Sequence, residues 1–456
     1  MAKPQAYHPD PSILELGSGF YDPVDAAKFP QDILRFANRT WAKRVGLDLD
    51  DAGWIRHFGR FEPLAGNLPR PLALRYHGHQ FRTYNPDIGD GRGFLFAQLR
   101  DKSGRLLDLG TKGSGQTPYS RFGDGRLTLK GGVREVLASE MLEALGVNTS
   151  KSFALVETGE QLTRGDEPSP TRSAVLTRLS HGHIRIGTFQ RLAFIEDKQG
   201  LTRLVNYSLE KLFGKAADSN ALTLFNETAT ATAKLAASYL AAGFVHGVLN
   251  SDNINITGES FDYGPWRFAP TWDEEFVAAY FDQGGLYAFG RQPEAIHWNL
   301  AQLGGCLALV ADGPALAEIL TGWPELFEEA LFAALVKRLG IEASGDDRAL
   351  VASLLLALRS QTVTIDRLFF DWRGGRVPVG YDGNEFAALK HQLEDCTASP
   401  DALDHDYWRV DGPCSMHIDE VEAIWAAITE GDDWAPFEAK IAAIRRMRDA
   451  MTPPCA

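Results

Sequence analysis

His246-Gly-Val-Leu-Asn-Ser-Asp-Asn253 is the stretch that decides the fold, and Asp262-Tyr-Gly264 follows it closely along the chain. On their own, the Asn and Asp residues of the first motif could simply form a turn, because their short polar side chains bind the turn backbone. The second motif adds a carboxylate. Amide and carboxylate oxygens are the ligands that hard divalent cations prefer. Together the two motifs indicate a metal site with Asn253 and Asp262 as ligands.

The order and spacing of these motifs are typical of protein kinases. A kinase has a catalytic loop His-Arg-Asp-Leu-x-x-x-Asn and then Asp-Phe-Gly. There the Asn and the second Asp bind magnesium on the nucleotide phosphates, while the first Asp accepts the substrate proton. His246, Asn253 and Asp262 align with that pattern, but Val248 occupies the position of the proton acceptor. Because valine cannot accept a proton, Asp252 is the nearest carboxylate able to take over.

A kinase-like site also needs a strand lysine paired with a helix glutamate to hold the phosphates. Lys112 follows the strand-like run 107–111. Glu135 lies within the pattern 132–145, whose apolar residues fall mostly on one helical face, and Gly146 is a typical helix end. A solvated lysine and a surface glutamate are the alternative. The order of all the motifs favours an ion pair between Lys112 and Glu135.

The chain changes character near its middle. Strand-like runs broken by Gly-rich turns dominate its first half, and helical patterns begin near Ser208. The strand-like runs are Gly93–Leu99, Leu106–Leu109, Phe153–Glu157 and Ala174–Leu179; the helical patterns are Thr223–Ala242 and Trp298–Arg359. This pattern predicts an α+β, kinase-like fold of two lobes: a strand-rich N-terminal lobe with one key helix and a mostly helical C-terminal lobe. We predict an N-terminal extension over 1–70, the N-lobe over 71–205 and the C-lobe over 206–456.

Two Gly-Asp-Gly-Arg segments flank Lys112, over 89–92 and 123–126. Glycine permits close backbone approach, so such loops can direct N–H groups at phosphate oxygens, although one Gly-Asp-Gly alone is more often a hairpin turn. Arginine forks suit the same oxygens. The arginines that could supply a local positive field are Arg92, Arg178 and Arg185.

Composition restricts the possible partners. The formal net charge of −14 opposes binding to nucleic acid and to anionic membranes. No apolar run approaches the length of a spanning helix, and the N-terminus lacks an apolar signal core. The four cysteines show no Cys-x-x-Cys pair. We expect a cytoplasmic monomer with reduced thiols, of which only Cys455 is placed like an exposed one.

Several long motifs resemble the selenoprotein O family, also called YdiU, whose members are protein adenylyltransferases with a kinase-like fold. The resemblance covers roughly residues 50–300 in consistent order. The matching segments are Tyr76-His-Gly-His-Gln-Phe81, Asn85-Pro86, Gly89-Asp-Gly-Arg92, Lys112-Gly-Ser-Gly-Gln-Thr-Pro-Tyr-Ser-Arg121, Gly123-Asp-Gly-Arg126, Arg134-Glu135, Leu176-Thr-Arg178, Arg185-Ile-Gly-Thr-Phe189, His246–Asn253, Asp262-Tyr-Gly-Pro265, Tyr287-Ala-Phe289 and Gln292-Pro293.

The resemblance implies a reaction different from that of a kinase. In that family ATP is held inverted, so that AMP passes to a protein Ser, Thr or Tyr hydroxyl and pyrophosphate leaves; UMP transfer from UTP is attributed to some members. By this resemblance Asp252 is the proton acceptor, and Asn253 and Asp262 bind Mg²⁺ or Mn²⁺. The implied nucleotide contacts are Gly89, Gly91, Arg92, Lys112, Asp124, Gly125, Arg178, Arg185 and Asp262.

The chain also departs from the family pattern. Many members carry a redox-active Cys-x-x-Cys or Cys-x-x-selenocysteine near the C-terminus, but here Thr452 stands three residues before Cys455. The last third lacks an Asn-Pro segment leading to Leu-Arg-Asn, and Arg82-Thr83 replaces a small Gly-rich pair. Two other functions stay open: a kinase that transfers the γ-phosphate with Asp252 as base, and an inactive nucleotide-binding scaffold.

Overall fold

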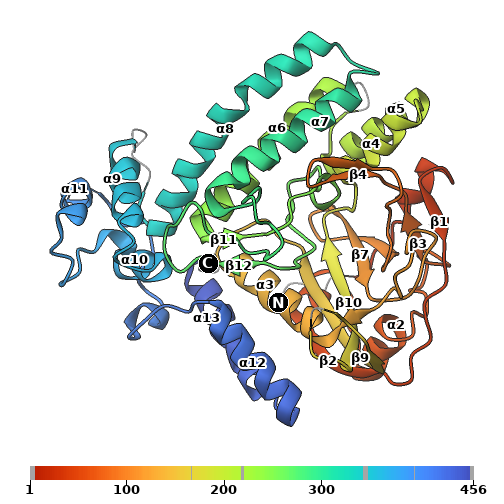
Figure 1. Cartoon of the computed structure of the whole chain (residues 1–456), viewed down its shortest axis with the longest axis horizontal. Coiled ribbons are helices and arrows are strands. Elements are labelled where there is room, and N and C mark those ends of the chain that lie inside the picture. Colours follow the sequence, from red (N-terminus) through yellow and green to blue (C-terminus); the bar gives the residue numbers. More distant parts are fainter. Residues whose placement is uncertain (1–5, 166, 217–219, 343–347, 395, 452–456) are drawn as a thin grey trace.

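The structure of the chain, a computed structural model, describes residues 6–165, 167–216, 220–342, 348–394 and 396–451, and within these an antiparallel sheet of eight strands fills one side of the molecule (Figure 1). The strand order is β1-β3-β6-β7-β10-β9-β2, with β8 beside β10. The strands are β1 Tyr21–Pro23, β2 Ile33–Ala37, β3 Leu72–Leu74, β6 Leu95–Arg100, β7 Leu106–Lys112, β8 Leu127–Thr128, β9 Lys151–Leu162 and β10 Thr171–Ser180.

The four predicted strand-like runs are found in the sheet as β6, β7, β9 and β10. Strand β7 lies in the middle of the sheet, and all seven of its residues are buried. Such a strand is covered on both faces, so its polar residues Asp108, Thr111 and Lys112 are buried together with its apolar ones. The edge strands β1 and β2 come from the first 70 residues, so part of the predicted extension belongs to the sheet.

The key helix of this half is α3, Leu129–Ala144. The side chain of Thr128 caps its start by accepting a hydrogen bond from the backbone N–H of Gly131 at 3.1 Å. Helix α3 packs against β9 and β10, with Val136, Leu137 and Met141 fully buried. Gly146, with φ of 81°, follows the last turn as the sequence predicts.

Helices make up most of the chain beyond the sheet. Two of them, α4 Ile186–Phe194 and α5 Lys198–Tyr207, come earlier than the pattern near Ser208 indicates. Helix α6, Ala221–Ala242, packs lengthwise against α7, Gln292–Leu307, and α8, Gly313–Leu339 (Figure 1). The small strands β11 Phe244–Val245 and β12 Arg267–Phe268 pair below α6. This α+β arrangement confirms the predicted fold class.

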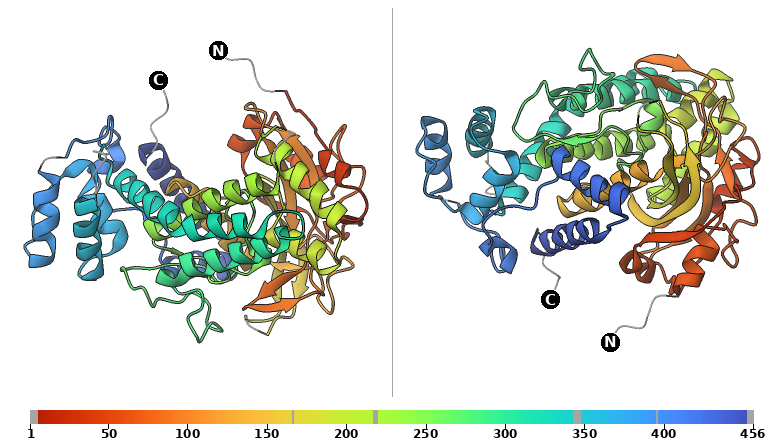
Figure 2. Two further views of the ribbon diagram at one scale, coloured as in Figure 1. Left: turned by 90° about the horizontal axis from the view of Figure 1, so that it is seen from above. Right: turned by 60° about the horizontal axis from the view of Figure 1, so that its bottom comes forward.

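The remaining helices form two groups. Around the end of α8 lie α9 Arg348–Arg359, α10 Ile365–Asp371 and α11 Asn384–Leu393, at the left of Figure 1. The last two helices, α12 Ile418–Gly431 and α13 Ala435–Met451, lie against α3 instead (Figure 2). Shorter elements complete the described chain: α1 Arg39–Arg44, α2 Asp51–Phe58, β4 Gly78–Gln80, β5 Thr83–Asn85, the 3₁₀ turns Ser12–Leu16, Ser251–Asn253, Phe289–Arg291, Arg373–Gly375 and Asp406–Arg409, and the π turn Ser208–Leu212.

Two sequence expectations are left open: the lobe boundaries and the exposed thiol at Cys455. The predicted boundaries at 70 and 205 stay predictions. Thr452 and Cys455 lie outside the described residues; within them, Cys306 and Cys414 are free thiols. In the described ranges, no helix combines the length and the apolar character that crossing a bilayer requires.

Candidate active site

A cavity of about 670 Å³ opens between the sheet and the helical half of the molecule. Its walls come from the loop after β5, the end of β7, the loop before α3, β10, the start of α4 and the loops around 248–262. The predicted nucleotide, metal and proton-acceptor residues all line it: Gly89, Gly91, Arg92, Lys112, Asp124, Gly125, Arg178, Arg185, Asp252, Asn253 and Asp262. Residues far apart in the sequence are thus brought to one place.

At the inner end of the cavity, two cations and two carboxylates form one cluster. Lys112, the last residue of β7, pairs with Glu135 of α3, as the sequence predicts. The same Lys112 Nζ lies 2.7 Å from Oδ1 of Asp262, and Arg178 of β10 donates to that oxygen at 3.1 Å. Arg178 also lies 3.9 Å from Glu135. The pairing of β7 with β10 sets the two cations side by side, since Gly110 is opposite Arg178.

This cluster keeps Asp262 ionised. Burial alone would disfavour its charge, but Lys112 and then Arg178 outweigh burial and hold the pKa of Asp262 well below its usual range. Asp262 also adopts φ of 65°, an uncommon conformation for a non-glycine residue. The strained backbone and the paired charge both indicate a residue held for function.

Arg185, the residue before α4, forms a second charged contact in the cavity. Its guanidinium lies 3.1 Å from Oδ1 of Asp90, donates to the backbone O of Asp252 at 3.2 Å, and stacks over the Tyr76 ring at 4.4 Å. The other Asp90 oxygen accepts from the N–H of Leu74 at 3.0 Å. Sequence reasoning missed Asp90, although it stands between Gly89 and Gly91; its position inside a Gly-Asp-Gly-Arg repeat was the available signal.

The segment His246–Asn253 is held in place by hydrogen bonds of its buried side chains. The Nε2–H of His246 donates to the backbone O of Phe261 at 2.9 Å, which ties this loop to the segment that carries Asp262. Asn250 accepts from the N–H of Phe81 at 3.0 Å and from the hydroxyl of Tyr287 at 2.7 Å. These bonds leave Val248 on the cavity wall.

Asp252 is the candidate proton acceptor, and its surroundings suit that role. The residue is only 9% exposed, and its Oδ1 is buried with no hydrogen-bond partner. Burial raises its pKa to about 6, against the opposing effect of Arg185. A carboxylate near that value can take a proton at neutral pH. Next to it, Asn253 donates from Nδ2 to the backbone O of Val248 at 3.1 Å, which fixes the orientation of its amide.

The loop before α3 forms the outer rim of the cavity. Gly125 has φ of 69°, and a Cβ there would lie 2.3 Å from the backbone of Gly115, so only glycine fits. Asp124 is exposed and pairs with Arg164 at 2.8 Å. Arg92 is exposed on the opposite glycine loop. These residues line the cavity without the dense pairing found at its inner end.

His183 is a further cavity residue that sequence reasoning did not assign. It is 5% exposed, its Nδ1 lies 3.1 Å from Asp108, and its Nε2 faces Gly110 of β7 without a partner. No pattern near His183 in the sequence marks the contact, because Asp108 is distant along the chain. The exposed Phe122 also lines the rim and was not assigned.

The described residues contain no cluster of three or more His, Cys, Asp or Glu side chains arranged to hold a metal ion. Asn253 and Asp262 nevertheless line the same cavity and offer one amide and one carboxylate. Magnesium usually takes one or two protein carboxylates and completes its shell with water and substrate phosphates. The donor set therefore fits a metal carried in with a nucleotide.

The α+β fold and the cavity between its two parts define the class of protein: a kinase-like, two-lobe architecture. Comparison with known sequences gives the family. A family model described as "Protein adenylyltransferase SelO" matches residues 5–445, and the chain belongs to this family.

Relatives named "Protein nucleotidyltransferase YdiU" match over nearly the whole chain. The relative from Synechocystis sp. is 42% identical and the alignment covers 94% of this chain and 96% of that protein. The one from Gloeobacter violaceus is 43% identical, with 96% and 95% covered. The one from Cereibacter sphaeroides is 36% identical, with 93% and 91% covered. The predicted family is confirmed.

Proposed function

We propose that this chain transfers AMP from ATP to hydroxyl groups of Ser, Thr or Tyr in proteins and releases pyrophosphate. The observation that supports the proposal is the cavity itself: it holds a charged cluster that includes Lys112 and Asp262, and it is lined by Val248, which stands in the sequence pattern where a kinase has its base. Membership of a protein adenylyltransferase family supports the same reaction. The relatives are named nucleotidyltransferases, which does not specify the nucleotide. Transfer of UMP from UTP is therefore a variant of the proposed reaction that this name also allows.

Each predicted residue has a role in this proposal. Lys112, Arg178 and Arg185 bind phosphate oxygens, since they are the buried cations of the cavity. The glycine loops at 89–92 and 123–126 enclose the rest of the nucleotide. Glu135 holds Lys112 in place through their ion pair.

Asp252 accepts the proton of the acceptor hydroxyl as its oxygen attacks the α-phosphorus. The new bond joins that oxygen to phosphorus, the bond from the α-phosphorus to pyrophosphate breaks, and pyrophosphate carries away the electron pair. The buried, unpartnered Oδ1 of Asp252 and its raised pKa support this role. Val248 cannot substitute, because it has no ionisable group.

We further propose that Mg²⁺ or Mn²⁺ binds at Asn253 and Asp262. A divalent ion there would neutralise phosphate charge, which otherwise repels the attacking oxygen. The low pKa of Asp262 supports the assignment, because a metal ligand must be deprotonated.

The test uses ATP labelled at either the α or the γ position, with Mg²⁺ or Mn²⁺ and a mixture of acceptor proteins. We expect covalent label on protein from α-labelled ATP and none from γ-labelled ATP. Stable γ-label without α-label would show a kinase. Tight ATP binding with neither label would show a scaffold.

A further inference from the structure

The C-terminal helix α13 packs on α3, the helix that supplies the partner of Lys112 (Figure 2). The face of α13 toward the core is apolar, with Ile441, Ile444 and Met447 all buried. Residues near the end of the chain therefore lie against an element of the active-site half. The established features of the cavity do not explain this contact.

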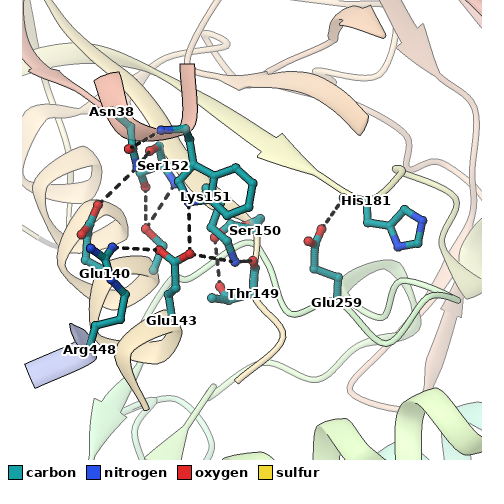
Figure 3. Close-up of polar contacts among 12 residues, drawn as sticks. Asn38, Glu140, Glu143, Thr149, Ser150, Lys151, Ser152, His181, Glu259 and Arg448 are labelled. Atoms are coloured by element: carbon teal, nitrogen blue, oxygen red, sulfur yellow. Dashed lines mark hydrogen bonds and ion pairs between the residues drawn. The ribbon is translucent and has the colours of Figure 1, made fainter. Parts of the chain in front are cut away.

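Charged side chains reinforce the contact between the two helices. Arg445 of α13 donates from Nε and from a terminal nitrogen to the two oxygens of Glu140 on α3, both at 2.8 Å. Glu140 is only 3% exposed, so this guanidinium supplies the counter-charge that its burial requires. One helical turn further on, Arg448 and Lys151 each lie 3.8 Å from Glu143 (Figure 3).

Hydrogen bonds connect Glu140 to the backbone beside Glu135. Asn38 donates from Nδ2 to Glu140 at 3.3 Å and to the backbone O of Ser152 at 3.1 Å (Figure 3). The hydroxyl of Ser152 in turn donates to the backbone O of Glu135 at 3.4 Å and accepts from Ser139 at 2.8 Å. The site of the α13 contact and the residue that pairs with Lys112 are thus joined by a short, buried network.

We infer that Arg445 is a positioning residue: through Glu140 it holds α3 where Glu135 pairs with Lys112. A buried carboxylate without a counter-charge must move toward water or take up a proton. Because Glu140 and Glu135 belong to one helix, such a movement also displaces Glu135. Lys112 would then be left with Asp262, 2.7 Å away, which is itself the proposed metal ligand. The inference rests on the proposed function only in taking Lys112 as a phosphate contact.

The consequence is a loss of nucleotide affinity when the pair is broken. We expect Arg445→Ala to weaken binding of ATP with magnesium about tenfold, which is within the range for coupling through a packed network. Arg445→Lys keeps the positive charge but loses the bidentate contact with Glu140. Its affinity for ATP should therefore lie between that of the native protein and that of Arg445→Ala. Arg446→Ala is the matched control, because Arg446 is the next residue on α13 and is exposed. It should bind ATP as the native protein does.

Two combined variants separate positioning from general damage to the fold. In Glu140→Gln with Arg445→Ala, no buried charge remains unpaired, so ATP affinity should recover. In Glu135→Ala with Arg445→Ala, the second change should add no further loss, because Glu135 is already gone. Hydrogen exchange should be faster in α3 of Arg445→Ala and should return to the native rate with Glu140→Gln.

Three outcomes would overturn the inference: native ATP affinity in folded Arg445→Ala, losses that add in the Glu135→Ala background, or no recovery with Glu140→Gln. If Arg445→Ala does not fold, Arg445→Lys and the Glu140→Gln pair decide the question. Binding is measured without acceptor protein, so a failure of the proposed adenylyl transfer would leave these results unchanged.

Discussion

Asp252 and Val248, in the segment 246–253, are the two residues to which a kinase reaction and an adenylyl transfer assign different roles. Asp252 is buried, has an unpartnered Oδ1, and lies beside the proposed metal ligand Asn253. Val248 lines the same cavity from the position of the kinase base. Changing each one separately shows which chemistry the cavity supports.

Replacing Asp252 by Ala should slow the reaction by roughly 10²–10⁴-fold, the usual contribution of a general base, and leave ATP affinity nearly unchanged. The measurement is turnover with α-labelled ATP beside a direct binding assay. Asp252→Asn, which keeps the shape of the side chain, is the matched variant and should be similarly slow. Full activity in either would show that Asp252 only shapes the turn.

Val248→Asp restores a carboxylate at the kinase position, yet it should not produce transfer of the γ-phosphate. The position of the reacting phosphorus limits the reaction before proton transfer does. Turnover with γ-labelled ATP measures this directly, after thermal melting has confirmed that the variant folds. Strong kinase activity would show that the nucleotide binds in the ordinary kinase orientation.

Glu259 gives a prediction about stability, because it is a buried carboxyl that accepts a hydrogen bond from the backbone N–H of His181 at 2.6 Å (Figure 3). Burial raises its pKa to about 7, above the ordinary value of 4.5, against the weaker effect of Lys151. The folded state therefore holds the proton more tightly than the unfolded state. The protonated Glu259 carboxyl therefore adds to the free energy of unfolding. This stabilisation is complete below about pH 4.5 and is lost as the pH rises to about 7.

Glu259→Gln should remove that pH dependence. Compared with the difference between the two proteins at low pH, the variant should gain up to about 3 kcal/mol of stability over the native protein above pH 7. The free energy of unfolding in urea, measured between pH 5 and 8 for both proteins, tests this. Glu438→Gln on the surface of α13 is a control that should follow the native curve. Parallel curves for Glu259→Gln and the native protein would contradict the assigned pKa.

Among the elements, those whose sequence pattern has one clear physical cause could be predicted. The strand-like run that forms β7, the helical pattern of α3 and the Gly146 stop all have local causes, and the structure confirms each of them. The one-sided apolar face predicted for α3 is wrong, because this helix is buried on nearly every side. The Lys112–Glu135 pair was also predicted, because it follows from a known order of motifs. What could not be predicted are contacts set by long-range packing.

Asp90, His183 and Arg445 show why those contacts escaped prediction. The partners of these three residues are Arg185, Asp108 and Glu140, and no local period or spacing relates them in the sequence. Likewise, α13 lies beyond the helical patterns identified in the sequence, and nothing local indicates which helix it covers. Only the folded arrangement brings α13 against α3.

The loop before α3 is an element whose conformation should control nucleotide binding. Gly125→Ala would force a positive φ on alanine and place its Cβ against the Gly115 backbone, so the loop must shift. We expect weaker ATP binding with a loss of stability of about 1–3 kcal/mol. Gly305→Ala, at an exposed and unobstructed position on α7, is the control. Native ATP affinity in Gly125→Ala would show that this loop does not enclose the nucleotide.

At the scale of the whole molecule, the two halves share part of their hydrophobic interior, and two further buried clusters lie within the separate halves. One cluster of buried side chains runs from Ile13 to Ala450 and includes Leu95 of β6, Val136 of α3 and Leu224 of α6. The cavity between the halves takes its walls from both. Unfolding one half would expose apolar surface of the other, so the halves should unfold together.

We therefore predict a single main thermal unfolding transition, and we expect bound nucleotide to raise the midpoint temperature of that one transition. A ligand that binds only the folded protein at about 100 times its dissociation constant adds about 2.7 kcal/mol of stability, so ATP with magnesium should raise the midpoint. Asp262→Ala should abolish most of this shift, because it removes the proposed metal ligand and frees Lys112 from one partner. Differential scanning calorimetry at several ATP concentrations measures both effects. Two separate transitions, of which ATP moves only one, would show that the sheet and the helices unfold independently and that the nucleotide contacts just one of them.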